Sequence, residues 1–178
     1  MNSPIDHRGE MPPHVQRLRR QLDELLDSLG ETARACGPTA AALHSFDGYR
    51  LKLPFHMVVL RGHNLQRVGH HIHTTTVLPP LDCEAVDGTR VTSPTRTLID
   101  LASTATAEQL TMALDGALRD LATTEEFLHR RALQHVVVAA GDADGDGLGL
   151  LLDGVGLAGQ VVDGVVQRCR QVVDHHRR

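Results

Sequence analysis

The stretch VDGTRVTSPTRTLIDLAS, Val86–Ser103, encodes a turn, a strand and a helix start in direct succession. Asp87-Gly88 predicts a two-residue hairpin turn, because a type I′ turn needs positive φ angles that Asp and Gly tolerate. Thr89–Thr92 then predicts the returning strand of the hairpin. Ser93 suits the N-cap of a helix, and Pro94 suits its first position, where the missing N–H has no helical partner to lose. The stretch therefore predicts a corner in which a hairpin leads directly into a helix.

The residues before this corner predict the rest of a sheet. Pro54–Leu60, PFHMVVL, is apolar at successive positions, which favours a buried strand. A turn is expected from Arg61 onward, and Val68–Val77 is rich in β-branched residues, which predicts a second strand. Apolar and acidic residues alternate over Leu81–Ala85, which indicates a half-buried strand with Asp82 on its polar face.

Segments with helical periodicity precede and follow the predicted strands along the chain. One helix is predicted over His14–Leu29 and a short one over Thr39–Phe46, and Thr123 to Glu126 fits a capping box that opens a helix ending near His135. Two apolar stripes carry the longer helices: Val15, Leu18, Leu22, Leu25 and Leu29 in the first, and Leu110, Ala113, Leu114, Ala117, Leu118 and Leu121 in a later one.

These elements predict an α+β fold. A small, mainly antiparallel sheet of about four strands is expected, packed by helices that begin near Ser93, Thr106 and Thr123, with the N-terminal helix lying across it. The organisation predicted along the chain is a disordered arm (1–13), an N-terminal helical segment (14–36), the α+β domain (37–135) and a flexible tail (136–178). The tail is predicted because Val, Gly, Asp and Leu dominate it and Gly disfavours regular structure.

Composition excludes several classes of function. The net charge is −4 with neutral histidines, so the chain has no overall basic field that would attract DNA. It has three Phe, one Tyr and no Trp, so aromatic platforms for single-stranded nucleic acid are not expected. The three cysteines show no CxxC spacing, and the polar N-terminus carries no apolar signal segment, which together favour the cytoplasm.

Four residues near the sheet are candidates for binding a partner: Arg61, Arg90, Arg96 and Asp100. Arg96 and Asp100 lie four positions apart at the start of the predicted helix. They could present a polar contact, form an i,i+4 ion pair, or let the arginine tie the helix start to the adjacent hairpin. The arginines around the sheet form either an anion-binding patch or a set of separately solvated side chains.

Two clusters raise the question of a metal ion. His71 and His73 share one face of a strand, and His56 on the neighbouring strand could supply a third imidazole, but a polar sheet face is the favoured interpretation of the pattern. Calcium-loop spacing is approached by Asp142, Asp144, Asp146, Gly147 and Asp153, but the usual long, bidentate Glu is replaced by Asp. We predict no metal and no cofactor.

Catalytic motifs are not recognisable in the sequence. It contains no GxSxG, P-loop, GxGxxG after a strand, or HExxH pattern. Cys83 stands between Asp82 and Glu84, and those carboxylates disfavour a reactive thiolate. We therefore expect a protein without enzymatic activity.

Five segments together are typical of one bacterial family. They are TAAALHSFDGYR (Thr39–Arg50), HMVVLRG (His56–Gly62), HHIHTTTVLPPLD (His70–Asp82), VDGTRVTSPTRTLIDLAS (Val86–Ser103) and AEQLTMALDGALRDLATTEEFLHRR (Ala107–Arg131). With these segments, the region from Thr39 to about Gln134 resembles the AbiEi-type antitoxins of type IV toxin–antitoxin systems, in their actinobacterial form.

The resemblance implies a domain that counteracts a nucleotidyltransferase-like toxin. It also implies a preceding winged helix that binds promoter DNA, whereas residues 1–36 contain one clear helix. Many actinobacterial relatives continue into an endonuclease-like domain, and no such pattern of paired acidic residues with Lys follows residue 135. The expected function is a non-catalytic antitoxin-like or regulatory protein that acts by protein binding, with a toxin as the expected partner. DNA-linked repression stays open as an additional role, although the N-terminus does not support DNA binding. The alternatives are a truncated, inactive relative of the endonuclease-bearing branch and a metal-responsive regulator.

Overall fold

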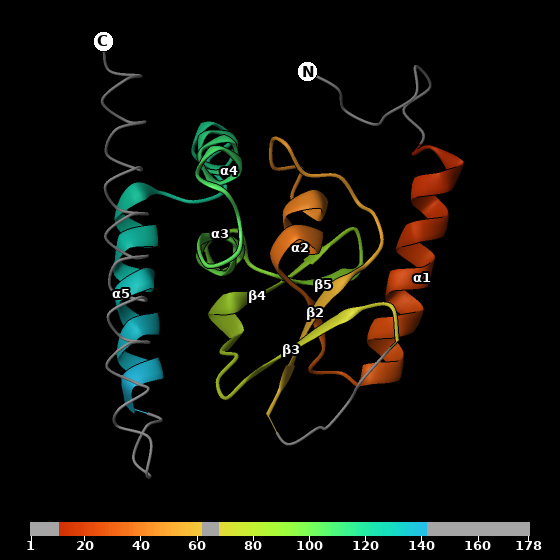
Figure 1. Cartoon of the computed structure of the whole chain (residues 1–178), viewed down its shortest axis with the longest axis horizontal. Helices are drawn as coiled ribbons and strands as arrows, with labels where there is room; N and C mark the ends of the chain where they lie inside the picture. The colour runs from red at the N-terminus through yellow and green to blue at the C-terminus, as the bar shows by residue number, and fades with distance from the viewer. Residues whose placement is uncertain (1–10, 62–67, 142–178) are drawn as a thin grey trace. The chain divides into compact units, whose positions relative to one another are not determined.

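The computed structural model describes residues 11–61 and 68–141 (Figure 1). Its elements in chain order are α1 (Pro13–Leu29), β1 (Arg34–Ala35), α2 (Gly37–Leu43), β2 (His56–Leu60), β3 (His71–Thr75), η1 (Pro80–Asp82), β4 (Cys83–Val86), β5 (Thr89–Thr92), α3 (Pro94–Ala102), α4 (Ala107–Arg119) and α5 (Glu125–Gly141). The chain divides into two compact units, Met1–Thr97 and Leu98–Arg178, with the boundary inside α3. The sheet belongs wholly to the first unit.

The five strands of the described residues form one mixed sheet in the order β3-β2-β1-β5-β4. β1 pairs antiparallel with β2 and parallel with β5, while β2–β3 is parallel and β4–β5 is antiparallel. The α+β class is confirmed, with five strands rather than about four. The additional strand is β1, which joins the β2–β3 pair to the β4–β5 hairpin.

The predicted corner is confirmed in detail. β4 and β5 pair from Cys83↔Thr92 to Val86↔Thr89, and the turn residues Asp87 and Gly88 have φ angles of 48° and 86°. Both positive φ values are those that a type I′ hairpin requires. At the helix start, the N–H of Arg96 donates to Ser93 Oγ at 3.4 Å. Ser93 therefore caps α3, which begins at Pro94.

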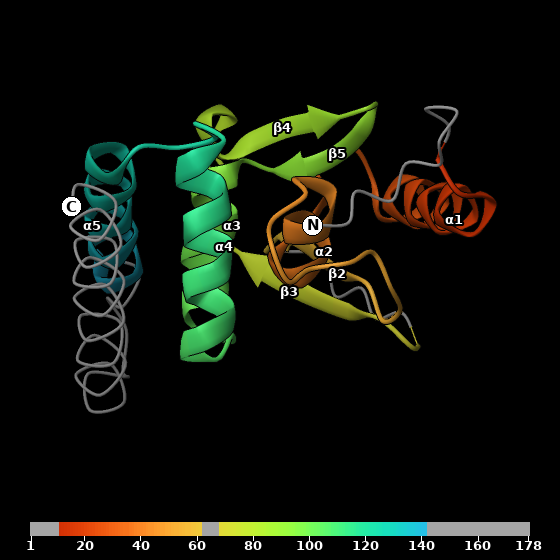
Figure 2. The same ribbon diagram turned by 90° about the horizontal axis from the view of Figure 1, so that it is seen from above.

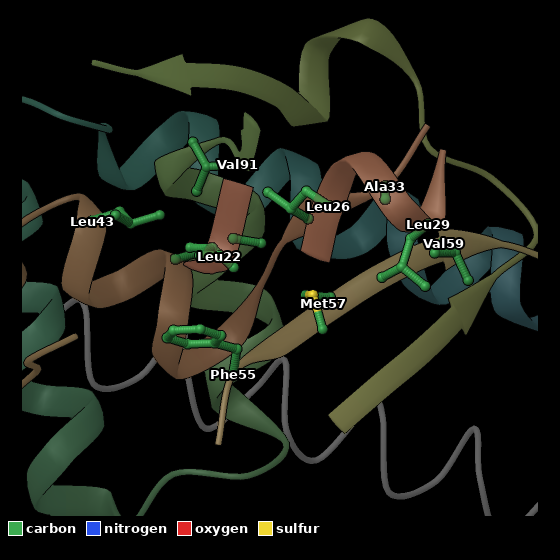
Figure 3. Close-up of a cluster of buried hydrophobic side chains, with 11 residues drawn as sticks. Leu22, Leu26, Leu29, Ala33, Leu43, Phe55, Met57, Val59 and Val91 are labelled. Carbon is green, nitrogen blue, oxygen red and sulfur yellow. The ribbon is translucent and has the colours of Figure 1, made fainter. Parts of the chain in front are cut away.

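The core of the first unit lies between α1 and the sheet (Figure 3). From α1 come Leu22, Leu26 and Leu29, which are at most 5% exposed. The sheet, α2 and the residues directly before β1 and β2 contribute the remaining buried members of the cluster: Ala33, Ala35, Ala40, Leu43, Phe55, Met57, Val59 and Val91. The predicted helix is confirmed, but its apolar stripe omitted Leu26, which is 1% exposed. The prediction that α1 lies on the sheet is thereby confirmed.

Helix α1 lies beside the turn end of the β4–β5 hairpin (Figure 2). Two arginines reinforce this docking. Arg19 donates from Nη1 to Asp87 Oδ2 at 2.7 Å and from Nη2 to the Val86 carbonyl at 2.6 Å. Arg90 donates from Nη2 to Asp27 Oδ1 at 2.7 Å and from Nη1 to the Gly30 carbonyl at 3.1 Å. Because both carboxylates are largely exposed, each ion pair is worth only about 0–1 kcal/mol.

Helices α4 and α5 dominate the second unit. The N-cap of α4 is Thr106, which forms a capping box with Gln109. Its buried stripe consists of Leu110, Ala113, Leu114, Gly116 and Ala117. Leu121 does not belong to this stripe, contrary to the prediction, because α4 ends at Arg119 and Leu121 is 83% exposed with a φ of 55°.

The start and end of α5 also differ from the sequence prediction. Thr124 rather than Thr123 caps the helix, since the N–H of Phe127 donates to Thr124 Oγ1 at 3.2 Å, and Thr123 is buried. Glu126 accepts from Arg130 Nη2 at 2.6 Å, which is an i,i+4 pair on the exposed surface. The helix continues to Gly141 instead of ending near His135.

Some predictions fall on residues outside the described ranges. These are most of the N-terminal arm, the turn after Arg61, and the tail beyond residue 141 with its aspartates at 142, 144, 146 and 153. Within the described ranges, no helix is both long and apolar enough to cross a membrane.

Candidate functional site

The first unit contains the corner, which we define from here on as residues 80–97. A buried ion pair lies inside this corner. Asp82 Oδ2 lies 3.2 Å from Arg96 Nη1, and the two side chains are 1% and 9% exposed. Asp82 ends η1, directly before β4, whereas Arg96 lies on the first turn of α3. The Asp82 carbonyl also accepts the N–H of Ser93 at 2.9 Å. The interpretation in which an arginine ties the helix start to the hairpin is therefore confirmed.

The burial of Asp82 corrects the predicted alternation of the strand. The sequence pattern placed Asp82 on the polar face and Leu81 on the apolar face, but Asp82 is buried and Leu81 is 57% exposed. The reason is local geometry, because Pro80–Asp82 forms a 3₁₀ turn and does not follow the two-residue period of a strand. A buried carboxylate is tolerated at this position because Arg96 compensates its charge.

The four predicted partner-binding residues have different surroundings. Arg61 is exposed at the end of β2, where its N–H donates to the Thr75 carbonyl at 2.7 Å. Arg90 binds Asp27, Arg96 binds Asp82 inside the corner, and Asp100 is half-buried on α3. Arg96 thus lies inside the corner, and Arg61 is the most accessible of these three arginines. A partner-binding role for the four residues stays a prediction.

The histidine cluster, defined as His56, His71 and His73, lies on β2 and β3. Parallel pairing sets His56 beside His71 and Val58 beside His73, so all three imidazoles share the face opposite Met57 and Val59. The ring centroids of His56 and His71 are 4.4 Å apart, and those of His56 and His73 are 5.5 Å apart. His56 Nδ1 and His73 Nε2 share a hydrogen bond of 3.2 Å. The prediction that these three residues meet on one face is confirmed.

The electrostatics of the cluster favour neutral imidazole at its centre. Burial, together with the charge repulsion of the neighbouring His71 and His73, lowers the pKa of His56 to about 4. His56 is consequently uncharged at neutral pH. Among the described residues, no group of three or more His, Cys, Asp or Glu is arranged to hold a metal ion. The cluster forms a polar face of the sheet.

The stability of the protein should fall on acidification because of His56. An unfolded histidine titrates near pH 6.5, whereas His56 in the folded chain titrates near about 4. Between these values the unfolded chain binds more protons at this position, so stability decreases as pH falls through this window. We expect His56→Gln to lose less thermal stability than the unaltered protein between pH 7 and pH 4.5, as measured by circular dichroism at several pH values.

His44 provides the internal reference for that measurement. Its pKa is lowered by burial, against the opposing influences of the Thr92 carbonyl at 2.7 Å and of Glu84. His44 remains in the His56→Gln variant, so a smaller pH dependence should persist there. Identical pH dependence in the two proteins would show that His56 is not the group responsible.

Comparison with known proteins identifies one family. A family model described as the AbiEi antitoxin C-terminal domain matches residues 33–153, which is more than half of the chain. The match includes every described element from β1 to α5, and therefore the corner and the histidine cluster, while α1 precedes it. Searches of curated proteins and of solved structures give no significant match. On the extent of the family match, the chain belongs to the AbiEi antitoxin C-terminal domain family.

Proposed function

We propose that this chain is a non-catalytic antitoxin that acts by binding a partner protein, a toxin of the nucleotidyltransferase type. Membership of the AbiEi antitoxin family over residues 33–153 carries the proposal, because it gives the chain an antitoxin-like regulatory role. The matched region includes a folded corner and sheet with a buried core, which is a suitable scaffold for a binding surface.

The charged residues of the first unit support binding rather than catalysis. Asp82 and Arg96 neutralise each other in the interior, and Arg90 is engaged with Asp27. Arg61 differs, because it is exposed and forms no ion pair in the part of the chain that the structure describes. Within the proposed contact surface of Arg61, Arg90, Arg96 and Asp100, we assign direct contact to Arg61 and a positioning role to Arg96.

Because α1 packs its buried leucines into the core, we favour protein binding over DNA recognition as the function of the first unit. A recognition helix presents its exposed side chains to the major groove and is supported by a second helix of the motif. α1 instead contributes three leucines to the core and is tied to the hairpin by Arg19 and Arg90. We therefore include no DNA contact by α1 in the proposal.

The proposal is tested by co-expression of this chain with a nucleotidyltransferase-type toxin from the same genome. We expect co-expression to restore bacterial growth, and calorimetry with the purified proteins to detect a complex. Arg61→Glu should weaken the complex about tenfold, which corresponds to ~1.4 kcal/mol. The matched control is Arg17→Glu, which reverses an exposed arginine on α1 and should leave affinity within about twofold. Undiminished toxicity at equal expression of both proteins would contradict the antitoxin function.

A further inference from the structure

Helix α1 continues into β1 through a short segment, residues 30–33, which we call the hinge. The family match begins at the last residue of the hinge, so α1 precedes the matched domain whereas the whole sheet lies within it. α1 takes no part in the ladder of strands. Side chains hold it on the sheet instead, through its three buried leucines and through the contacts of Arg19 and Arg90. Because every copy of the chain presents the same surfaces, two chains that exchange α1 keep all these contacts.

Gly30 sets the path of the hinge in the closed form, in which α1 packs on its own sheet. Its φ and ψ angles are 100° and 172°, a combination that is essentially restricted to glycine. Its N–H donates to the Asp27 carbonyl at 3.2 Å, and its carbonyl accepts from the N–H of Ala33 at 3.1 Å. A Cβ added to Gly30 would meet no atom within 4 Å beyond the adjoining residues. Alanine at this position therefore strains the backbone of the closed form without a steric clash.

A short hinge whose closed form is easily strained favours the exchange of an element between chains. An extended hinge has negative φ angles, which any residue adopts without strain. Its four residues then span about 13–14 Å, which exceeds the ~10–12 Å diameter of a helix. The hinge is thus long enough for α1 to leave its own sheet. The closed and exchanged forms differ at the hinge and share the contacts of α1.

We propose that Gly30 keeps α1 on its own sheet, and that α1 docks on the sheet of a second copy when the hinge extends. Glycine permits the closed hinge without strain, so we expect the unaltered chain to be a monomer at micromolar concentration. The exchanged dimer forms when two chains transfer α1 to each other, and each α1 then buries the same leucines against the partner copy. The inference goes beyond the proposed function, because the occupant of this surface is a second copy of the chain and not a toxin.

Gly30→Ala is expected to convert the monomer into a dimer. If alanine disfavours each closed hinge about tenfold, the dimerisation constant rises about a hundredfold, because each dimer relieves two hinges. Sedimentation velocity over a series of concentrations measures this change, after the protein is refolded from urea so that α1 is free to exchange. The matched control is Gly88→Ala. Gly88 also has a positive φ, 86°, and open space around an added Cβ, but it lies in the β4–β5 turn. Its replacement should lower thermal stability and leave the protein monomeric.

Two charge-reversed chains test whether the dimer forms by exchange of α1. Arg19 Nη1 lies 2.7 Å from Asp87 Oδ2, so Arg19→Asp and Asp87→Arg each place like charges at this contact in a closed chain. In a mixed exchanged dimer, the altered α1 of one chain meets the altered hairpin of the other, and the two unaltered residues meet at the second contact. We expect mixed dimers to exceed their statistical share about tenfold at low salt, as measured by native mass spectrometry after the two chains are refolded together at high concentration.

Three results would overturn the proposal. The first is a Gly30→Ala protein that dimerises no more than the unaltered chain. The second is equal dimerisation by Gly88→Ala, since general destabilisation would then explain the dimer. The third is a statistical share of mixed dimers, which is expected when two closed chains associate side by side. The charge-reversed chains both retain Gly30, so the mixing experiment decides the question even if Gly30→Ala folds poorly.

Discussion

Asp82→Ala is expected to lower the free energy of unfolding by about 3–5 kcal/mol, the usual cost of removing one partner of a buried ion pair. The substitution leaves the guanidinium of Arg96, whose side chain is 9% exposed, without the carboxylate that lies 3.2 Å away. A loss of this size is a large fraction of the 5–15 kcal/mol typical of a folded protein. Urea unfolding followed by circular dichroism measures it as a lower midpoint with an unchanged slope.

Asp87→Ala is the matched control for this prediction. Asp87 also pairs with an arginine, since its Oδ2 lies 2.7 Å from Arg19 Nη1, but its side chain is 73% exposed. Solvent screens such a pair, so its removal should cost only about 0–1 kcal/mol. A second comparison replaces both partners, because Asp82→Ala with Arg96→Met removes the uncompensated charge and should recover part of the loss. Equal destabilisation by Asp82→Ala and Asp87→Ala would show that the buried pair does not stabilise the corner.

Leu22→Ala is expected to destabilise the protein by about 2–5 kcal/mol. Leu22 is fully buried in the cluster formed by α1, the sheet and α2. Truncation removes apolar contact and leaves a cavity that the rigid strands fill only in part, which explains the size of the effect. Thermal and urea unfolding measure the loss, and the neighbouring exposed position provides the control, since Gln21→Ala should change stability by no more than about 0.5 kcal/mol.

The Leu22→Ala result also decides whether α1 is part of the folded unit. The family match begins at residue 33, after α1 has ended, although α1 supplies three buried leucines to the core. A destabilisation similar to that of Gln21→Ala would show that α1 is an attachment whose packing contributes little. The expected result makes α1 an integral layer, so any shortened form that lacks it should expose the apolar face of the sheet.

The features that the sequence predicted well are those fixed by local interactions. The turn at Asp87-Gly88, the cap at Ser93 and the proline that follows it each depend on residues within a few positions along the chain. Their chemistry allows few alternatives, because positive φ angles and an N-cap hydroxyl have specific steric and hydrogen-bonding requirements. That His71 and His73 share a face was predictable for a related reason, since strand periodicity determines which side chains of one strand project together. His56 joins them through the register between β2 and β3.

The features that the sequence missed depend on residues far apart along the chain. β1 has only two residues and is a strand only because β2 and β5 lie on either side of it, so no periodicity within Arg34–Ala35 could reveal it. The sequence pattern placed Asp82 on the polar face of a strand, because nothing near it in the sequence shows that it is buried beside Arg96. The sequence left Arg96 open between a partner contact, an i,i+4 ion pair and a tie between helix and hairpin, and only the structure shows its side chain buried beside Asp82.

The amino-acid sequence by itself determined the α+β class and the hairpin-to-helix corner, because turn chemistry, capping and side-chain periodicity act over short distances. It also identified the family. Only the tertiary structure decided which charges are neutralised inside the corner and how β1 merges two strand pairs into one sheet. Those outcomes depend on which segments come together in space. Burial makes a compensating partner necessary for the charge of Asp82, and the neighbours β2 and β5 make a strand of two residues possible.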